Sequence, residues 1–235
     1  MERLSEEELK GLSEHKYSVY DPSLLSVLFL RDFWDWCVSW YPSWLAPNLI
    51  TLTGLLLNLS AVLLQGYFST DATTEAPRWC YLLCAVTLFA YQTLDGTDGK
   101  QARKTNSATP LGELFDHGCD SVAQGLVTVE YCSALLMGDY PGFTISFLLL
   151  SLFLFYAAHW QAYLNGILLF EQFDVQEAIV YITSVSLVSG ILGPTVWKSK
   201  RKQWVERSCW WLAGVKESEK GAASAIKMNL LLCII

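Results

Sequence analysis

The chain has 235 residues, of which 52% are hydrophobic and 17% are charged, and its formal net charge is −7. Its basic residues form no stripe of the kind that binds nucleic acid, so we expect no nucleic-acid partner. The mean hydropathy is +0.30, and several apolar runs reach the roughly 17–25 residues that a helix needs to cross a bilayer. The composition therefore excludes an ordinary soluble domain and predicts an all-α, polytopic transmembrane helical bundle.

Residues 1–46 are expected to form a cytosolic segment that ends in an amphipathic helix. Residues 24–41 are apolar and aromatic, but they include Arg31, Asp32 and Asp35. Tryptophan and tyrosine are favoured at the level of the lipid headgroups. A helix with one apolar and one charged face lies along the membrane surface. We therefore expect an interfacial amphipathic helix at residues 24–41.

Apolar runs predict about five membrane spans in a transmembrane core at residues 47–197. They cover residues 49–68, 79–95, 112–137, 143–165 and 176–197. Lysine and arginine occur before the first run and between the second and third, and are nearly absent from the other connections within the core. The positive-inside rule then places the amino terminus and the connection between the second and third runs on the cytosolic side.

The segment after the core does not fit this topology. Residues 198–227 hold half of the 16 basic residues, although a fifth span would place them on the lumenal side. The last apolar run, "MNLLLCII", is too short to span a bilayer. We therefore expect residues 198–235 to be a basic tail apart from the core, in a C-terminally truncated product that lacks a sixth helix.

A charged stretch, "LDGTDGKQARKTNSATPLGELFDHGCD" at residues 94–120, interrupts the apolar sequence. Asp95 and Asp98 are three residues apart, and Asp116 and Asp120 are four apart, so each pair shares one face of a helix. Four carboxylates directed into one cavity repel one another unless cations lie between them. Because Mg²⁺ is held by a few carboxylates together with substrate phosphate, the spacing predicts a centre for two divalent ions. The alternative is a loop of solvated acids.

Small and basic residues lie next to these acids. Gly96, Gly99 and Ala102 have little side-chain bulk, so a polar ligand can approach the backbone closely; small residues also serve close helix packing in membranes. Lys100 and Arg103 add positive charge that suits a diphosphate. The pattern favours a phosphate-bearing ligand in company with the metal centre.

Glu113 and His117 add a candidate acid–base pair. They are four residues apart on roughly the same helical face as Asp116 and Asp120. A carboxylate can orient an imidazole so that it acts as a general base. The alternative is a structural histidine with no part in chemistry.

The charged stretch resembles the signature of the CDP-alcohol phosphotransferases. "DGTDGKQAR" and "GELFDHGCD" match Asp-x-x-Asp-Gly-x-x-Ala-Arg, eight residues, then Gly-x-x-x-Asp-x-x-x-Asp. The wider segments "PSWLAPNLIT", "DGKQARKTNSATPLGELFDHGCDS" and "AHWQAYLNGIL" resemble the eukaryotic choline/ethanolamine branch of that family. The resemblance covers about residues 5–197.

This resemblance implies a reaction at the endoplasmic reticulum or Golgi membrane, with the active site toward the cytosol. Phosphocholine or phosphoethanolamine would pass from CDP-choline or CDP-ethanolamine to diacylglycerol, giving phosphatidylcholine or phosphatidylethanolamine and CMP. The implied residues are Asp95, Asp98, Asp116 and Asp120 for two Mg²⁺ or Mn²⁺ ions, Asn48, Gly99, Lys100, Ala102 and Arg103 for the cytidine diphosphate portion, and Glu113, His117 and Asp120 for catalysis.

Two other functions stay open at this stage. A truncated isoform can be catalytically impaired and act as a non-catalytic or regulatory membrane protein that pairs with the full-length enzyme. A divalent-cation transporter would also use intramembrane acids, but it does not explain the arrangement of Gly99, Ala102 and Arg103. The choice between choline and ethanolamine, and association into a homodimer, also stay open.

Overall fold

The computed structural model describes residues 5–7, 10–11 and 18–199. The chain divides into two units, Met1–Pro194 and Thr195–Ile235. The predicted basic tail at 198–235 lies outside the described residues, except for 198 and 199 at its start.

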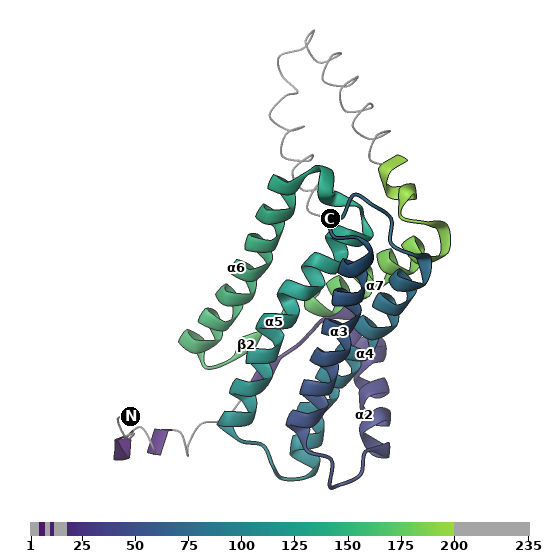
Figure 1. The fold of residues 1–235 in the computed structure, drawn as a ribbon. Coiled ribbons are helices and arrows are strands. Elements are labelled where there is room, and N and C mark those ends of the chain that lie inside the picture. The colour runs from purple at the N-terminus through teal and green to yellow at the C-terminus, as the bar shows by residue number, and fades with distance from the viewer. Residues whose placement is uncertain (1–4, 8–9, 12–17, 200–235) are drawn as a thin grey trace. The chain divides into compact units, whose positions relative to one another are not determined.

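Five long helices build the described part of the first unit. They are α3 (Pro47–Phe68), α4 (Arg78–Lys104), α5 (Pro110–Ala134), α6 (Pro141–Asn165) and α7 (Val175–Leu192). Helix α3 packs against α4 and α5, α7 packs against α4, and α6 packs along α5 (Figure 1). A core cluster of Leu88, Tyr91, Ala123 and Val127 joins α4 to α5. The predicted all-α fold class is confirmed.

Each predicted span corresponds to one of these helices, but the composition of the helices differs. Helices α3, α6 and α7 are long and apolar enough to cross a membrane, whereas α4 and α5, which carry the charged stretch, do not meet that criterion. Helix α4 also continues to Lys104, so that the first half of the charged stretch is helical rather than a loop. Composition alone therefore supports three of the five predicted spans.

The fifth predicted span, residues 176–197, extends beyond the carboxyl end of the helix in the structure. Helix α7 stops at Leu192, and Gly193 follows with a φ of +91°. Glycine adopts this conformation readily, and the next residue, Pro194, has no amide hydrogen to continue a helix. The helix therefore ends at the glycine rather than at the end of the apolar run.

The amphipathic helix expected at residues 24–41 is present as a π-helical turn, η1 (Ser26–Leu30), followed by α2 (Arg31–Trp40). Leu30, Trp34 and Val38, spaced four residues apart, are buried, while Trp36 and Trp40 are exposed. This spacing places one apolar stripe against the protein. The position of the helix at the membrane surface stays a prediction.

A short parallel strand pair ties the segment before α2 to the connection between α6 and α7. Strand β1 (Val19–Tyr20) pairs with β2 (Leu168–Leu169), with Val19 opposite Leu168. The Leu25 amide also donates to Glu177 Oε1 at 2.9 Å. Strands of two residues have no periodicity to detect, so the sequence did not predict them.

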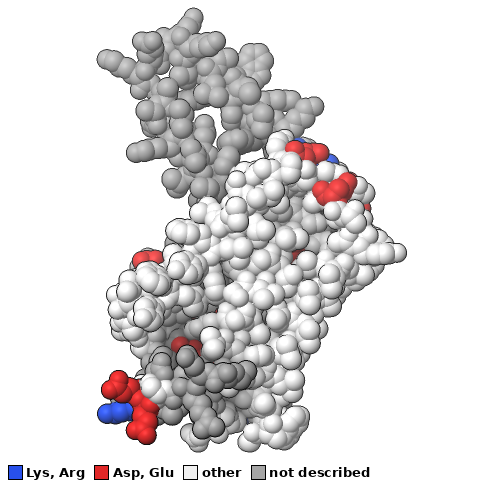
Figure 2. Space-filling model, turned by 60° about the vertical axis from the view of Figure 1, so that its left-hand side comes forward, with Lys and Arg blue, Asp and Glu red and all other residues white. Residues whose placement is uncertain are grey.

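The surface of the unit suits contact with lipid. Figure 2 shows a face whose broad middle carries few charged side chains. Large apolar residues are exposed on the apolar helices, among them Leu63, Leu149, Phe153 and Ile191. Exposed apolar surface of this extent marks contact with a membrane or another protein.

Helix α2 is docked on α4 by one close approach and two lysines. A Cβ atom at Gly96 would overlap the buried indole ring of Trp34. Lys100 Nζ lies 2.6 Å from Asp35 Oδ1, and Lys104 Nζ donates to two main-chain carbonyls at the end of α2, each at 2.7 Å. The small residue and the two cations thus fix the amino-terminal helix beside the charged stretch.

We predict that Gly96→Ala lowers the free energy of unfolding by about 1–3 kcal/mol, because overpacking forces the indole or the helix to move. The matched control is Gly125→Ala in α5, where an added Cβ meets no atom within 4 Å. There the better helix propensity of alanine leaves stability unchanged or raises it by up to about 1 kcal/mol. Thermal unfolding in detergent measures both, and equal effects would contradict the close approach of Trp34.

Candidate active site

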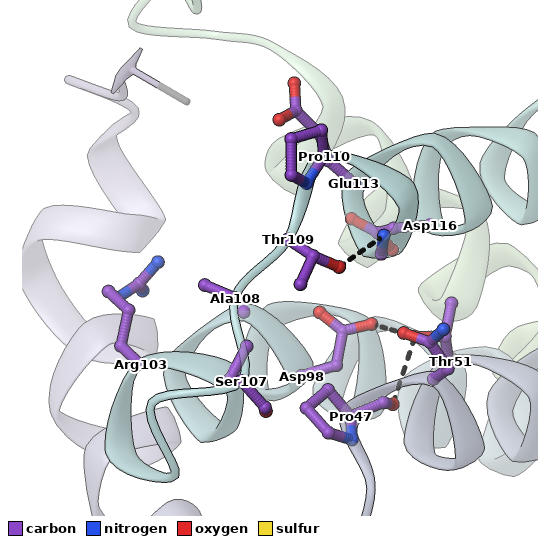
Figure 3. A pocket seen from close by; sticks show the side chains of 14 residues that line it. Pro47, Thr51, Asp98, Arg103, Ser107, Ala108, Thr109, Pro110, Glu113 and Asp116 are labelled. Carbon is purple, nitrogen blue, oxygen red and sulfur yellow. Dashed lines mark hydrogen bonds between the residues drawn. The ribbon is translucent and has the colours of Figure 1, made fainter. Parts of the chain in front are cut away.

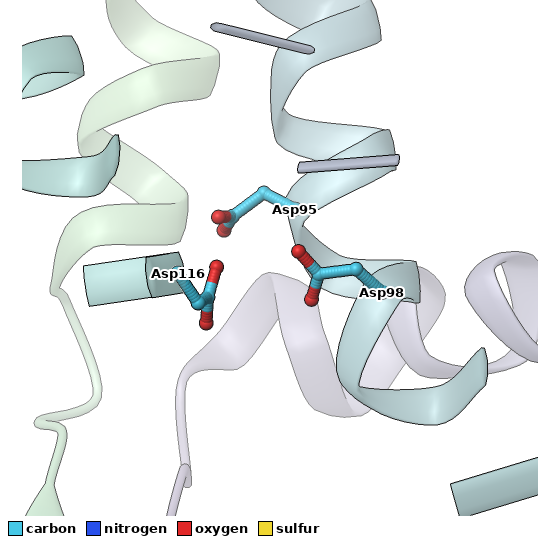
Figure 4. A group of neighbouring side chains, drawn as sticks. All are labelled: Asp95, Asp98 and Asp116. Atoms are coloured by element: carbon cyan, nitrogen blue, oxygen red, sulfur yellow. The ribbon is translucent and has the colours of Figure 1, made fainter. Parts of the chain in front are cut away.

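An acidic cluster lies between α4 and α5. Asp95 and Asp98 of α4 and Asp116 of α5 each offer one carboxylate oxygen, and these oxygens lie within 4.8 Å of one another. The three side chains point toward one another (Figure 4). The three-residue spacing directs the first two to one face of α4, and α5 brings the third to meet them.

Neighbouring hydroxyl groups fix the orientation of the acids. The Thr51 hydroxyl of α3 donates to Asp98 Oδ2, and the Tyr91 hydroxyl donates to Asp120 Oδ1 at 2.7 Å. Asp116 Oδ1, in contrast, is buried and has no hydrogen-bond partner among the described residues. An oriented group of carboxylates with one oxygen left open fits a hard divalent cation such as Mg²⁺ or Mn²⁺.

Asp120 lies one turn beyond Asp116 on α5 and is not part of this close group. Its carboxylate binds Tyr91, and it remains near enough to Asp95 to interact with it electrostatically. The structure therefore brings together three of the four predicted metal ligands. A second ion that uses Asp120 stays a prediction.

A cavity of about 450 Å³ adjoins the cluster. Asp98 and Asp116 form part of its wall, together with four of the five residues predicted to contact the nucleotide, which are Asn48, Gly99, Ala102 and Arg103. Arg103 lies on one side of the cavity and the two aspartates on the other (Figure 3). The cavity thus has an acidic edge suited to metal and an opposite cation suited to phosphate.

The amino terminus of α5 forms a further wall. Thr109, Pro110 and Gly112 line the cavity; Pro110 occupies the first turn, and Thr109 Oγ1 accepts a hydrogen bond from the Gly112 amide at 3.1 Å. Proline at the first position and threonine before it favour the start of a helix. The amide groups and the dipole of a helix amino terminus favour an anion.

The two lysines of the charged stretch do not line the cavity. Lys100, the fifth predicted nucleotide contact, pairs with Asp35 of α2 instead, and Lys104 holds main-chain carbonyls. Arg103 is the basic side chain among the described residues that line the cavity. The structure therefore separates the basic residues into one that faces the ligand space and two that dock α2.

The candidate base lies at the contact between α5 and α6. Glu113 lines the cavity, whereas His117, one turn further along α5, is not among its lining residues. The imidazole of His117 contacts that of His159 from α6, with ring centroids 4.7 Å apart and an angle of 75° between the planes. Glu113 and His117 both lie on α5 with Asp116, and their action as an acid–base pair stays a prediction.

For three residues of the site, the sequence did not predict the contact that the structure shows. Tyr91 precedes Asp95 by four residues and could have been placed on its helical face. His159 is an ionisable residue inside an apolar span, which is a functional signal in itself. Thr51 gave no signal, because a threonine in the first turns of a membrane helix is ordinary and its bond to Asp98 is a long-range contact.

The comparisons with known proteins agree with this geometry. The model of the family described as CDP-alcohol phosphatidyltransferase matches residues 44–191. The chain belongs to this family. The matched range holds α3 to α6, nearly all of α7, the acidic cluster and the cavity, so the resemblance seen in the charged stretch is confirmed.

Individual relatives match most of the chain. Cholinephosphotransferase 1 of Gallus gallus is 48% identical over 197 residues, 84% of this chain and 58% of the relative. The protein of the same name from Homo sapiens is 46% identical over 196 residues, 83% of this chain and 48% of the relative. Cholinephosphotransferase 1 of Danio rerio is 42% identical over 199 residues, which are 85% of this chain and 52% of the relative. The chain spans about half the length of these relatives, and with its apolar helices it is a multi-pass membrane protein.

We predict that Mg²⁺ or Mn²⁺ raises the melting temperature of the purified protein, because a ligand that binds only the folded state stabilises that state. At a ligand concentration 100-fold above the dissociation constant, this stabilisation is about 2.7 kcal/mol. Asp116→Asn should remove most of this stabilisation. Asp32→Asn, in an exposed position on α2, is the matched control and should keep it. A metal-dependent shift that survives in Asp116→Asn would contradict a site in the acidic cluster.

Proposed function

We propose that the protein transfers phosphocholine or phosphoethanolamine from CDP-choline or CDP-ethanolamine to diacylglycerol, giving phosphatidylcholine or phosphatidylethanolamine and CMP. The observation that carries this proposal is the cavity of about 450 Å³, which joins the acidic cluster to Arg103 and the amino terminus of α5. The names of the relatives favour choline as the alcohol.

The cytidine diphosphate portion binds in this cavity. Arg103 presents its guanidinium to the diphosphate, with which it can form two parallel hydrogen bonds. Asn48 contributes an amide, and Gly99 and Ala102 leave room for the nucleotide beside α4. Lys100, which is bound to Asp35, supports this wall by holding α2 in place.

Asp95, Asp98 and Asp116, with Asp120, hold two Mg²⁺ or Mn²⁺ ions in this proposal. When bound, the ions neutralise the charge of the diphosphate and of the departing CMP. Thr51 and Tyr91 keep two of the carboxylates oriented, and this leaves their other oxygens available to ligands.

The lipid hydroxyl loses its proton to His117, with Glu113 and Asp120 contributing negative charge nearby. The hydroxyl oxygen forms the new bond to the phosphorus of the phosphoalcohol, and the bond from that phosphorus to CMP breaks. General-base catalysis of this kind contributes about 10²–10⁴-fold to a rate. Positioning and charge stabilisation supply the rest.

We place this reaction at the cytosolic side of the endoplasmic reticulum or Golgi membrane, because the basic residues of the charged stretch are typical of a cytosolic connection. A bilayer location suits a reaction in which one substrate dissolves in lipid and the other in water. Residues 1–46 then form the cytosolic segment, residues 47–197 the catalytic core, and a homodimer is the assembly to test.

Product analysis of the purified protein tests the transfer. With labelled CDP-choline or CDP-ethanolamine, diacylglycerol and Mg²⁺ or Mn²⁺, we expect label in the lipid product. Asp116→Asn should abolish incorporation while the protein remains inserted in the membrane, and Asp32→Asn should retain it. Undiminished activity of Asp116→Asn would count against the metal role, and an inactive wild-type protein would support the non-catalytic alternative.

Substitutions of Arg103 and of Lys100 should affect the KM for the CDP-alcohol differently in the same assay. We predict that Arg103→Ala raises KM for the CDP-alcohol about tenfold or more, since a hydrogen bond to a charged group is worth about 1.5–3 kcal/mol. Lys100→Ala, the matched control, should lower the melting temperature and leave KM within about threefold, because Lys100 contacts Asp35. A larger KM effect for Lys100→Ala would reverse the assignment of the two cations.

A further inference from the structure

His159 is an unusual residue in its helix. It lies in α6, an apolar span that has no fully buried residue, and its ring is directed at α5, where it contacts His117. An ionisable side chain at membrane depth is costly and commonly functional. The transfer proposed above gives His159 no part.

The ring of His159 is held in one orientation by the preceding turn of α6. Its Nδ1 lies 2.9 Å from the main-chain oxygen of Phe155, and the Phe155 ring lies against it with centroids 4.2 Å apart. A carbonyl oxygen can only accept a hydrogen bond, so Nδ1 carries the hydrogen. In the neutral imidazole, Nε2 then has a free lone pair.

This lone pair is buried and lacks a partner among the described residues. A buried acceptor without a donor is unfavourable, so the site calls for an N–H or O–H group. The polar ring in contact with His159 is that of His117, at 4.7 Å between centroids. An N–H of the His117 ring is therefore the donor that we assign to this acceptor.

We propose that His159 is a positioning residue for His117: its Nε2 accepts the N–H of His117 and so directs the other, unprotonated nitrogen of His117 to the hydroxyl of the lipid substrate. This inference rests on the proposed function, in which His117 takes the proton. A base that is oriented by a third group is a recurring arrangement in enzymes. In this arrangement His159 selects the tautomer of the His117 imidazole, and Glu113 contributes only its negative charge.

Two substitutions separate this role from simple packing. His159→Phe keeps an aromatic ring against His117 and Phe155 but removes the acceptor, whereas His159→Gln offers an amide oxygen at a similar reach. We expect His159→Phe to lower kcat about tenfold or more, with KM for the CDP-alcohol unchanged, and His159→Gln to recover most of the loss. Equal rates for the two variants would overturn the proposal.

A double variant tests whether His159 acts through His117. If it does, His159→Phe has no further effect in a protein that already carries His117→Ala, because the interaction is already absent. Losses that multiply in the double variant would show that His159 acts separately, and would overturn the proposal.

A measurement without turnover separates this inference from the proposed function. The chain has three histidines, so ¹⁵N-labelled histidine gives few ring signals, and the His117→Ala variant identifies those of His117. We expect His159→Phe to shift the His117 ring-nitrogen signals and His159→Gln to restore them. If the His117 signals shift in His159→Phe but the wild-type protein transfers no label, the contact between His159 and His117 is supported and the proposed function is contradicted. If the His117 signals are the same in His159→Phe as in the wild-type protein, the inference is overturned.

Discussion

Mutual repulsion among carboxylates is the constraint around which the site is built. Three acidic oxygens within 4.8 Å of one another repel more strongly in the interior of a helical bundle than in water, because the effective dielectric constant is lower. The Thr51 hydroxyl of α3 opposes this repulsion by donating to Asp98, and the Tyr91 hydroxyl of α4 donates to the neighbouring Asp120. In the proposed function, a divalent cation occupies the space between the carboxylates and links α4 to α5.

Helix α4 has two functions that lie on different sides of the helix. One side carries Asp95 and Asp98 toward the cluster, and Arg103, near the carboxyl end of the helix, lines the cavity. Another side receives α2 through Gly96 and Lys100. A single charged stretch therefore contains both the groups that meet a ligand and the groups that hold the fold around it. This division explains why its basic residues cannot be assigned to phosphate by charge alone.

Much of the fold and of the acidic cluster was predictable from the sequence, because both depend on local spacing. Apolar runs located the five long helices, and intervals of three and four residues placed the aspartates on shared faces. The pairing of Lys100 with Asp35, the bond from Thr51 to Asp98 and the contact of His117 with His159 were not predictable. Each joins residues more than 40 positions apart, and helical periodicity says nothing about which faces of different helices meet.

The site lies between two environments, and its residues are distributed accordingly. The cavity is walled by α3, α4, the start of α5 and the connection before it, and it holds Asn48 and Arg103. His117 turns instead to α6, a helix with no buried residue whose apolar side chains are largely exposed. The cavity thus offers Arg103 to a water-soluble diphosphate, whereas the candidate base borders a lipid-facing helix. In the proposed transfer, an in-line displacement requires the lipid hydroxyl to attack the phosphorus on the side opposite the departing CMP.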